Sequence, residues 1–182
     1  YTINTTTLSN GTNILNVTAF DRAGNSISAS QNFVVDNQGP TGFTVSSTAQ
    51  TETTIDLSWT AATDALSGPV TYDVYRGGVK VNTTPISATT YSLTSLTAGT
   101  SYSILVKALD TMGNTTDSNT ISVSTKLPPK EGDIDGDNAV NSADLGILIA
   151  TWGSTADLRA DLDNSGRVGS GDLAKLISRW GT

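Results

Sequence analysis

Aspartates at a regular spacing near the C-terminal end of the chain are the side chains best placed to do chemistry. Between residues 133 and 144 they occupy the first, third, fifth and twelfth places of a twelve-residue stretch, and between 161 and 172 the first, third and twelfth. Carboxylates crowded this closely repel one another unless a hard cation neutralises them. Calcium accepts about six to eight oxygen ligands in a flexible geometry, whereas magnesium demands a near-ideal octahedron. The spacing therefore predicts two calcium sites.

Calcium loops of this spacing take ligands from places one, three, five, seven, nine and twelve, the seventh through its carbonyl. The predicted ligands of the first loop are Asp133, Asp135, Asp137, the Ala139 carbonyl, Asn141 and Asp144. Those of the second loop are Asp161, Asp163, the Ser165 hydroxyl, the Arg167 carbonyl, Gly169 through a water, and Asp172. Because ligand charge tunes affinity, we expect the first loop to bind more tightly. The competing interpretation, aspartates that cap helix N-termini, explains only Asp144 and Asp172.

The two loops belong to a duplicated unit, since a shift of 28 residues gives ten identities in 22 aligned positions. After each loop, apolar residues recur at i, i+3, i+4 and i+7, which predicts two amphipathic helices. The residues of these apolar stripes are Leu145, Leu148, Ile149, Trp152, Leu173, Leu176, Ile177 and Trp180. We expect both tryptophans to pack on the stripe. Gly153 and Gly181 are placed to end the helices, and Asn138 and Gly166 hold the sharp turn at the sixth loop place.

The rest of the chain has the pattern of β-structure. Residues 13–20 and 28–35 alternate between apolar and polar around a turn at 21–25, which predicts a hairpin. Residues 39–126 show short alternating runs separated by turn signals, as in an all-β sandwich. We expect Trp59, Tyr72 and Tyr102 to fill and pin its core rather than to bind sugars.

Composition excludes several classes of function. The 182 residues include no cysteine and no histidine, so disulfides, thiolate nucleophiles, imidazole bases and zinc sites built from these residues are ruled out. The net charge of -7, from 17 acidic and 10 basic side chains, argues against a nucleic-acid partner. No apolar run approaches the about 20 residues of a membrane span. Residues 131–182 hold nine acidic and four basic side chains, so most of the negative charge lies with the predicted loops.

Two loop–helix units that lack the entering helix of a full EF-hand, placed behind a proline linker, resemble a type I dockerin over residues 132–182. The resemblance implies two bound calcium ions, metal-dependent folding and docking onto a cohesin domain of a scaffold or cell-surface protein. It also implies cohesin contacts at loop places ten and eleven and at two helix positions of each unit: Ser142, Ala143, Ile149, Ala150, Ser170, Gly171, Ile177 and Ser178. Helical spacing is equally consistent with core positions for Ile149 and Ile177.

Residues 39–126 resemble a fibronectin type III module, because Trp59 ends an apolar run and Leu96 precedes Tyr102 at the tyrosine-corner spacing. Residues 1–38 resemble the C-terminal part of a bacterial immunoglobulin-like repeat, but they are too few for a sandwich of about 100 residues, so we expect a truncated domain. The predicted fold class is thus multidomain: immunoglobulin-like and fibronectin type III sandwiches, a proline-rich linker at 127–131, and a small all-α dockerin-like domain of two loop–helix repeats at 132–182.

The leading hypothesis is a noncatalytic, extracellular attachment region that attaches a larger protein to a cohesin-bearing partner. The chain begins without Met or a leader, so we expect it to be the C-terminal piece of a longer secreted protein, with a polysaccharide-degrading enzyme upstream. The alternative is a cell-surface stalk or adhesin whose calcium unit only stabilises its end. An enzyme within the chain is the weakest hypothesis, because the clustered aspartates are committed to the loops and the only glutamates are Glu52 and Glu131.

Overall fold

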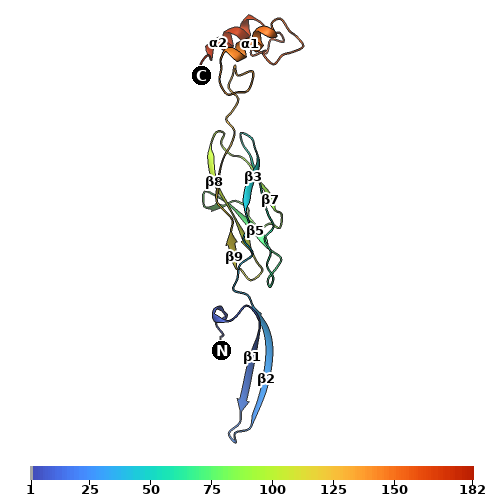
Figure 1. Cartoon of the computed structure of the whole chain (residues 1–182), viewed down its shortest axis with the longest axis vertical. Helices are drawn as coiled ribbons and strands as arrows, with labels where there is room; N and C mark the ends of the chain where they lie inside the picture. Colours follow the sequence, from blue (N-terminus) through green and yellow to red (C-terminus); the bar gives the residue numbers. More distant parts are fainter. Residues whose placement is uncertain (1) are drawn as a thin grey trace. The chain divides into compact units, whose positions relative to one another are not determined.

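The computed structural model describes residues 2–182, and the chain divides into two compact units, Tyr1–Lys126 and Leu127–Thr182. In the described residues, the first unit contains ten β-strands and one short 3-10 helix, η1 (Thr5–Thr7), and the second contains two α-helices (Figure 1). The sequence prediction of β-structure followed by a small helical region is therefore confirmed.

The first two strands form a long hairpin. Strands β1 (Gly11–Phe20) and β2 (Ser26–Val35) pair antiparallel along their whole lengths, and in the described residues each pairs only with the other. The turn between them is held by Asp21, whose carboxylate accepts the N–H groups of Ala23 and Asn25 at 2.9 Å. The predicted hairpin is thus confirmed, with Phe20 and Ile27 exposed beside its turn.

The remaining strands form two sheets. One has the order β3–β4–β7, and the other has the order β10–β8–β5–β6, with β9 pairing to β8 (Figure 1). The bounds are β3 Val45–Gln50, β4 Ile55–Trp59, β5 Thr71–Arg76, β6 Val79–Lys80, β7 Thr90–Leu93, β8 Ser101–Leu109, β9 Thr115–Asp117 and β10 Ile121–Ser124. The alternating apolar residues of both sheets share one core cluster, as expected for a sandwich.

Aromatic residues pin this core as predicted. Trp59 and Tyr72 pack edge to face with ring centroids 5.4 Å apart, and both are buried. The hydroxyl oxygen of Tyr72 accepts the N–H of Ala62 at 2.8 Å. That of Tyr102 accepts the N–H of Thr97 at 2.9 Å, next to buried Leu96, which is the expected tyrosine corner. These contacts confirm a packing role for the three aromatic residues.

The second unit has two nine-residue helices, α1 (Ser142–Ala150) and α2 (Ser170–Ser178), which contact each other. Their small core is fully buried and consists of Val140, Leu148, Ala160, Val168 and Leu176. Among the described residues, no helix has the length and apolar character needed to cross a membrane.

The expectation that both tryptophans pack on the helical stripe is wrong. Trp152 is 49% exposed and Trp180 is 46% exposed. The reason is helix length: α1 ends at Ala150 and α2 at Ser178, so each tryptophan lies in the turn that follows its helix. Gly153 and Gly181 adopt the left-handed conformation, with φ of 80° and 75°, in the turns that end the two helices.

Candidate metal centres

The first acidic loop gathers three carboxylates at one place. One oxygen from each of Asp133, Asp135 and Asp137 lies within 4.8 Å of the others. The backbone of the loop wraps around the first of these: Oδ1 of Asp133 accepts the N–H of Gly136 at 2.7 Å, and Oδ2 accepts the N–H of Asn138 at 2.8 Å. Asn138 has the left-handed φ of 70° that was predicted for the sixth loop place.

The twelfth residue ties this loop to the start of α1. The side chain of Asp144 is fully buried; its Oδ1 accepts the N–H groups of Ile134 and Asp135 at 2.7 and 3.2 Å, and its Oδ2 accepts that of Asn141 at 2.8 Å. The N-cap of α1 is Asn141, whose Oδ1 accepts the N–H of Ala143 at 2.7 Å. Asp144 therefore holds the helix N-terminus, as the capping interpretation requires, and also closes the loop around the other carboxylates.

The second loop gathers a different set, in which one oxygen from each of Asp161, Asp163 and Asp172 lies within 4.8 Å of the others. The two oxygens of Asp161 accept the N–H groups of Ser165 and Gly166, at 3.0 and 2.9 Å. Oδ1 of Asp172 accepts the N–H of Asp163 at 2.9 Å. The twelfth carboxylate joins the cluster here, whereas in the first loop it does not belong to the group of three.

The other predicted ligands of the second loop lie close to this cluster. The hydroxyl of Ser165 donates to the carbonyl oxygen of Arg167 at 3.0 Å, so the oxygens predicted at the fifth and seventh places are neighbours. Gly169 donates its N–H to Oδ2 of Asp172 at 2.6 Å and has no side chain that could supply a ligand atom. Both loops thus expose mainly oxygen atoms, which suit a hard divalent cation and no softer metal.

The pKa of the aspartate at the third loop place shifts in opposite directions in the two loops. The N–H of Asp137 lowers the pKa of Asp135, but desolvation and the charges of Asp137, Asp144 and Asp133 outweigh it and raise the pKa above its ordinary value. The pKa of Asp163 is lowered instead, chiefly by the side chain and the N–H of Ser165. The single hydroxyl proton of Ser165 serves either this carboxylate or the Arg167 carbonyl at any one time. The first loop therefore carries the repulsion that a bound cation relieves.

All eight residues predicted to contact a partner are exposed. Ile149 is 61% exposed and Ile177 is 58% exposed, while their neighbours Leu148 and Leu176 are completely buried. The alternative, that the isoleucines are core residues, is therefore wrong. The helices bury one side of the apolar stripe against each other and leave the isoleucines outside.

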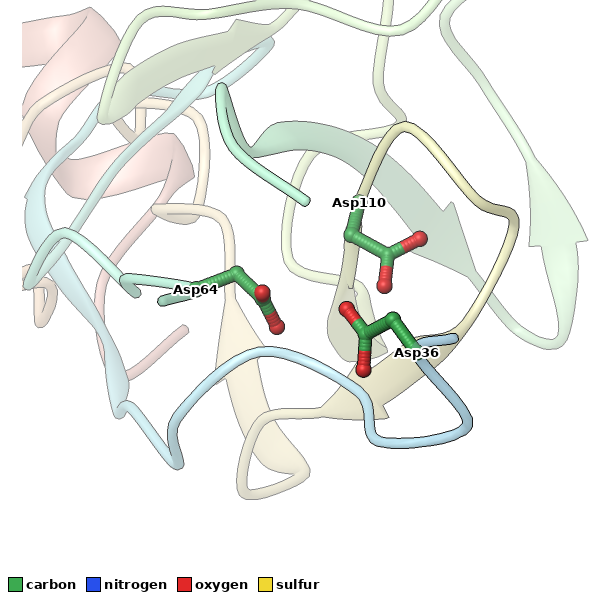
Figure 2. Close-up of side chains that lie close together, drawn as sticks. All are labelled: Asp36, Asp64 and Asp110. Carbon is green, nitrogen blue, oxygen red and sulfur yellow. The ribbon is translucent and has the colours of Figure 1, made fainter. Parts of the chain in front are cut away.

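A third acidic cluster, which we did not predict, lies in the first unit. Figure 2 shows Asp36, Asp64 and Asp110 turned toward one another, with one oxygen from each within 4.8 Å of the others. The hydroxyl of buried Ser67 lies 2.8 Å from Asp110 Oδ2 and 3.1 Å from Asp64 Oδ1, and it also contacts Asp36 Oδ2. A hydroxyl carries one proton, so it donates to only one of these carboxylates at a time.

Local turns account for two members of this cluster. Oδ1 of Asp64 accepts the N–H groups of Leu66 and Ser67 at 2.9 Å, and these bonds lower its pKa. Oδ1 of Asp110 accepts the N–H groups of Met112 and Asn114 at 2.8 Å. The turns around Asp64 and Asp110 could have been predicted from the sequence. The approach of the three aspartates could not, because it arises from the tertiary fold.

Comparisons with known proteins agree with this two-part architecture. Residues 38–124 match the family model of the Fibronectin type III domain, and residues 131–179 match that of the Dockerin type I domain. Chitinase A1 of Niallia circulans is 43% identical over 120 residues, which cover 60% of this chain and 17% of the relative. Exoglucanase B of Cellulomonas fimi is 38% identical over 120 residues, which cover 60% of this chain and 11% of the relative.

A solved sixth fibronectin type III domain of a human fibronectin type III domain containing protein superposes with a TM-score of 0.45 and 19% identity, over 53% of this chain and 94% of that domain. The chain spans only a small part, 17% or less, of the two curated relatives described above. Residues 38–124 therefore belong to the fibronectin type III family and residues 131–179 to the type I dockerin family, both of which are noncatalytic modules.

Proposed function

We propose that this chain is an extracellular, noncatalytic attachment region, in which the dockerin domain binds one calcium ion in each loop and docks onto a cohesin domain of a scaffold or cell-surface protein. The observation that carries the proposal is the convergence of carboxylates in both copies of the repeat. In each loop the first and third aspartates meet a further carboxylate within 4.8 Å. Helix capping alone gives no reason for that convergence.

The proposed ligands are those predicted from the loop spacing. In the first loop the carboxylates of Asp133, Asp135, Asp137 and Asp144, the amide oxygen of Asn141 and the Ala139 carbonyl would hold the ion. In the second loop Asp161, Asp163, Asp172, the Ser165 hydroxyl and the Arg167 carbonyl would do so, with a water at Gly169. A bound calcium ion supplies positive charge that neutralises the carboxylates and joins the loop to its helix N-terminus. Two such ions add +4 to a segment whose side chains sum to -5.

The proposed cohesin surface lies on the exposed side of the helices. Ile149 and Ile177 present apolar area that the small core leaves uncovered, and exposed apolar area that is rimmed by polar residues is typical of interaction sites. The remaining contacts would come from the other predicted positions: Ser142, Ala143, Ala150, Ser170, Gly171 and Ser178. Because the two copies are similar, each helix offers a related surface.

The rest of the chain would act as support. We propose a fibronectin type III spacer at 39–126, a linker at 127–131, and the end of an immunoglobulin-like domain at 1–38. A polysaccharide-degrading enzyme in the same longer protein is supported by the names of the relatives, chitinase and exoglucanase. In this arrangement the chain tethers an enzyme without taking part in its reaction.

A cohesin capture experiment tests the proposal. Immobilised cohesins encoded in the same genome should retain the full chain in calcium and release it in a chelator. The double variant Asp133→Ala and Asp161→Ala should not be retained, because each loop loses its first ligand. Asp157→Ala is the matched control, since this aspartate lies outside both loops and its half-exposed carboxylate pairs, within residues 2–182, with Arg159 alone. Retention that ignores both the chelator and the double variant would refute calcium-dependent docking.

A stalk whose calcium unit merely stabilises the chain end is the second candidate. It is favoured by the way this unit closes on itself: Glu131 forms ion pairs with Lys175 at 3.3 Å and with Arg179 at 2.7 Å, both on the C-terminal helical segment. Calcium binding with no retention on any of the cohesins would support the stalk. Retention of the full chain in trans would support docking.

A further inference from the structure

At the eleventh place of the second loop, a side chain would meet the carboxylate of Asp163. A Cβ atom built on Gly171 would lie 2.0 Å from Oδ2 of Asp163 and 3.1 Å from its Cγ. The conflict is one of space and not of backbone conformation, because Gly171 is not among the residues with a positive φ. The carboxylate of Asp163 therefore occupies the volume that any other residue would fill.

The first loop differs from the second at the eleventh place and also at the fifth, where Asp137 stands in place of Ser165. Its eleventh place holds Ala143, and there the third-place carboxylate, Asp135, groups with Asp133 and Asp137 rather than with the twelfth residue. In the second loop Asp163 groups with Asp161 and Asp172. The turns themselves are alike, since Oδ1 of Asp135 accepts the N–H of Asp137 at 3.1 Å and Oδ1 of Asp163 accepts that of Ser165 at 3.0 Å.

We propose that Gly171 is a positioning residue of the second calcium loop, whose missing side chain lets the Asp163 carboxylate turn over the start of α2 to join Asp172. This inference rests on the proposed calcium function. It gives Gly171 a role in the ligand geometry in addition to the cohesin contact that the dockerin resemblance implies for the eleventh place.

Gly171→Ala separates this role from general stability. Alanine is a better helix former than glycine, and residue 171 lies in the first turn of α2, so the variant should be at least as helical as the wild type without calcium. Its calcium affinity should nevertheless fall. Residues that orient metal ligands typically contribute about 10- to 100-fold to affinity, so we expect the second-site Kd to rise about tenfold or more.

The experiment is calcium titration of the full chain by calorimetry, with each site identified by the amide signals of its own loop in NMR spectra. Wild type, Gly171→Ala and the matched variant Ala143→Gly are compared, together with Asp163→Ala alone and combined with Gly171→Ala. The first-site Kd should stay within about twofold of wild type in Gly171→Ala, and the combined variant should bind no more weakly than Asp163→Ala alone, because coupled residues are not additive.

An unchanged second-site Kd in Gly171→Ala would overturn the inference while leaving the proposed function intact, provided that the wild type binds two ions. Additive losses in the combined variant would also overturn it, because they would show that Gly171 acts independently of Asp163. If instead the wild type binds no calcium, the proposed function itself fails. A far-UV spectrum of the calcium-free variants detects any loss of helix that would otherwise imitate a weaker site.

Discussion

The backbone N–H of Gly153, in the turn after α1, donates to the carbonyl oxygen of Val168 in the second loop at 2.8 Å. The reciprocal bond exists in the other copy, where Gly181 donates to the carbonyl oxygen of Val140 at 2.9 Å. Both valines occupy the eighth place of their loops and are completely buried. Each loop is thus fastened to the segment that leaves the opposite helix. Complete unfolding of one loop should therefore also release the turn that follows the opposite helix.

Removal of calcium should unfold the dockerin unit and leave the sandwich folded. The unit has a core of only five fully buried residues and no disulfide, and small domains of this kind usually depend on a metal or a covalent link. Amide hydrogen exchange measures both parts at once. In a chelator, protection should disappear at Gly153 and Gly181 but persist in β4, β5 and β8. Protection at the two glycines that is unchanged by the chelator would contradict metal-dependent folding.

Asp144→Ala and Asp172→Ala should leave sites of unequal strength. Asp144→Ala damages the first loop and keeps the second loop intact, with its three predicted carboxylates. Asp172→Ala damages the second loop and keeps the first loop intact, with its four predicted carboxylates. Because ligand charge tunes calcium affinity, the residual Kd should be lower in Asp172→Ala. Titration calorimetry gives both values. Equal or reversed residual affinities would show that charge count does not set the order.

The same two substitutions should also destabilise the folded unit through lost hydrogen bonds. Each carboxylate accepts backbone N–H groups that would be left without a partner: three at Asp144 and two at Asp172. An unsatisfied buried donor costs about 1–3 kcal/mol. In saturating calcium, we therefore expect Asp144→Ala to lose more helical signal than Asp172→Ala. Asp157→Ala, on an exposed side chain, is the control and should change neither the signal nor the affinity.

Truncation of the helix isoleucines should weaken cohesin binding, whereas truncation of the neighbouring leucines should lower the stability of the unit. Ile149→Ala and Ile177→Ala remove exposed atoms, so the free energy of unfolding should change by less than about 0.5 kcal/mol, while cohesin affinity should fall. Leu148→Ala and Leu176→Ala remove fully buried atoms and should cost about 2–5 kcal/mol of stability. Calorimetric unfolding in saturating calcium and binding to an immobilised cohesin provide the two measurements. A cohesin that binds the isoleucine variants as well as wild type would place the interface elsewhere.

Local patterns of the sequence were enough to predict the hairpin, the sandwich with its aromatic core, and both helices. The left-handed turns at Asn138 and Gly166 were also predictable, because the loop spacing requires a sharp bend there. The lengths of the helices could not be predicted, since the helical spacing of apolar residues continues through Trp152 whereas α1 ends at Ala150. The approach of Asp36, Asp64 and Asp110 was not predictable either, because it depends on three loops meeting in space. The contact of Asp163 with Gly171 depends on a rotamer, which no spacing rule specifies.

The acid stability of the sandwich should depend on Asp110. Burial is the largest single influence on the pKa of Asp110 and raises it, but hydrogen bonds from Asn114, Ser67 and Met112 together lower it below the ordinary value of 3.8. A folded-state pKa below the unfolded value means that the stabilisation is fully present above about pH 4 and is lost as pH falls through the lowered pKa. The sandwich should therefore lose stability on acidification below about pH 4.

Asp110→Asn tests this directly. At neutral pH the variant loses the charged acceptor of these hydrogen bonds, which should cost about 1–3 kcal/mol of unfolding free energy. The difference from wild type should shrink as the pH falls through the lowered pKa, because wild-type Asp110 then becomes protonated too. Asp117→Asn is the matched control: its carboxylate pairs with Lys107, its side chain is 51% exposed, and exposed pairs contribute about 0–1 kcal/mol. Chemical unfolding of the full chain between pH 2 and 7, followed by the NMR signals of Val74 and Val106, gives the comparison. A wild-type and Asp110→Asn difference that stays constant over this range would show that the carboxylate charge does not stabilise the fold.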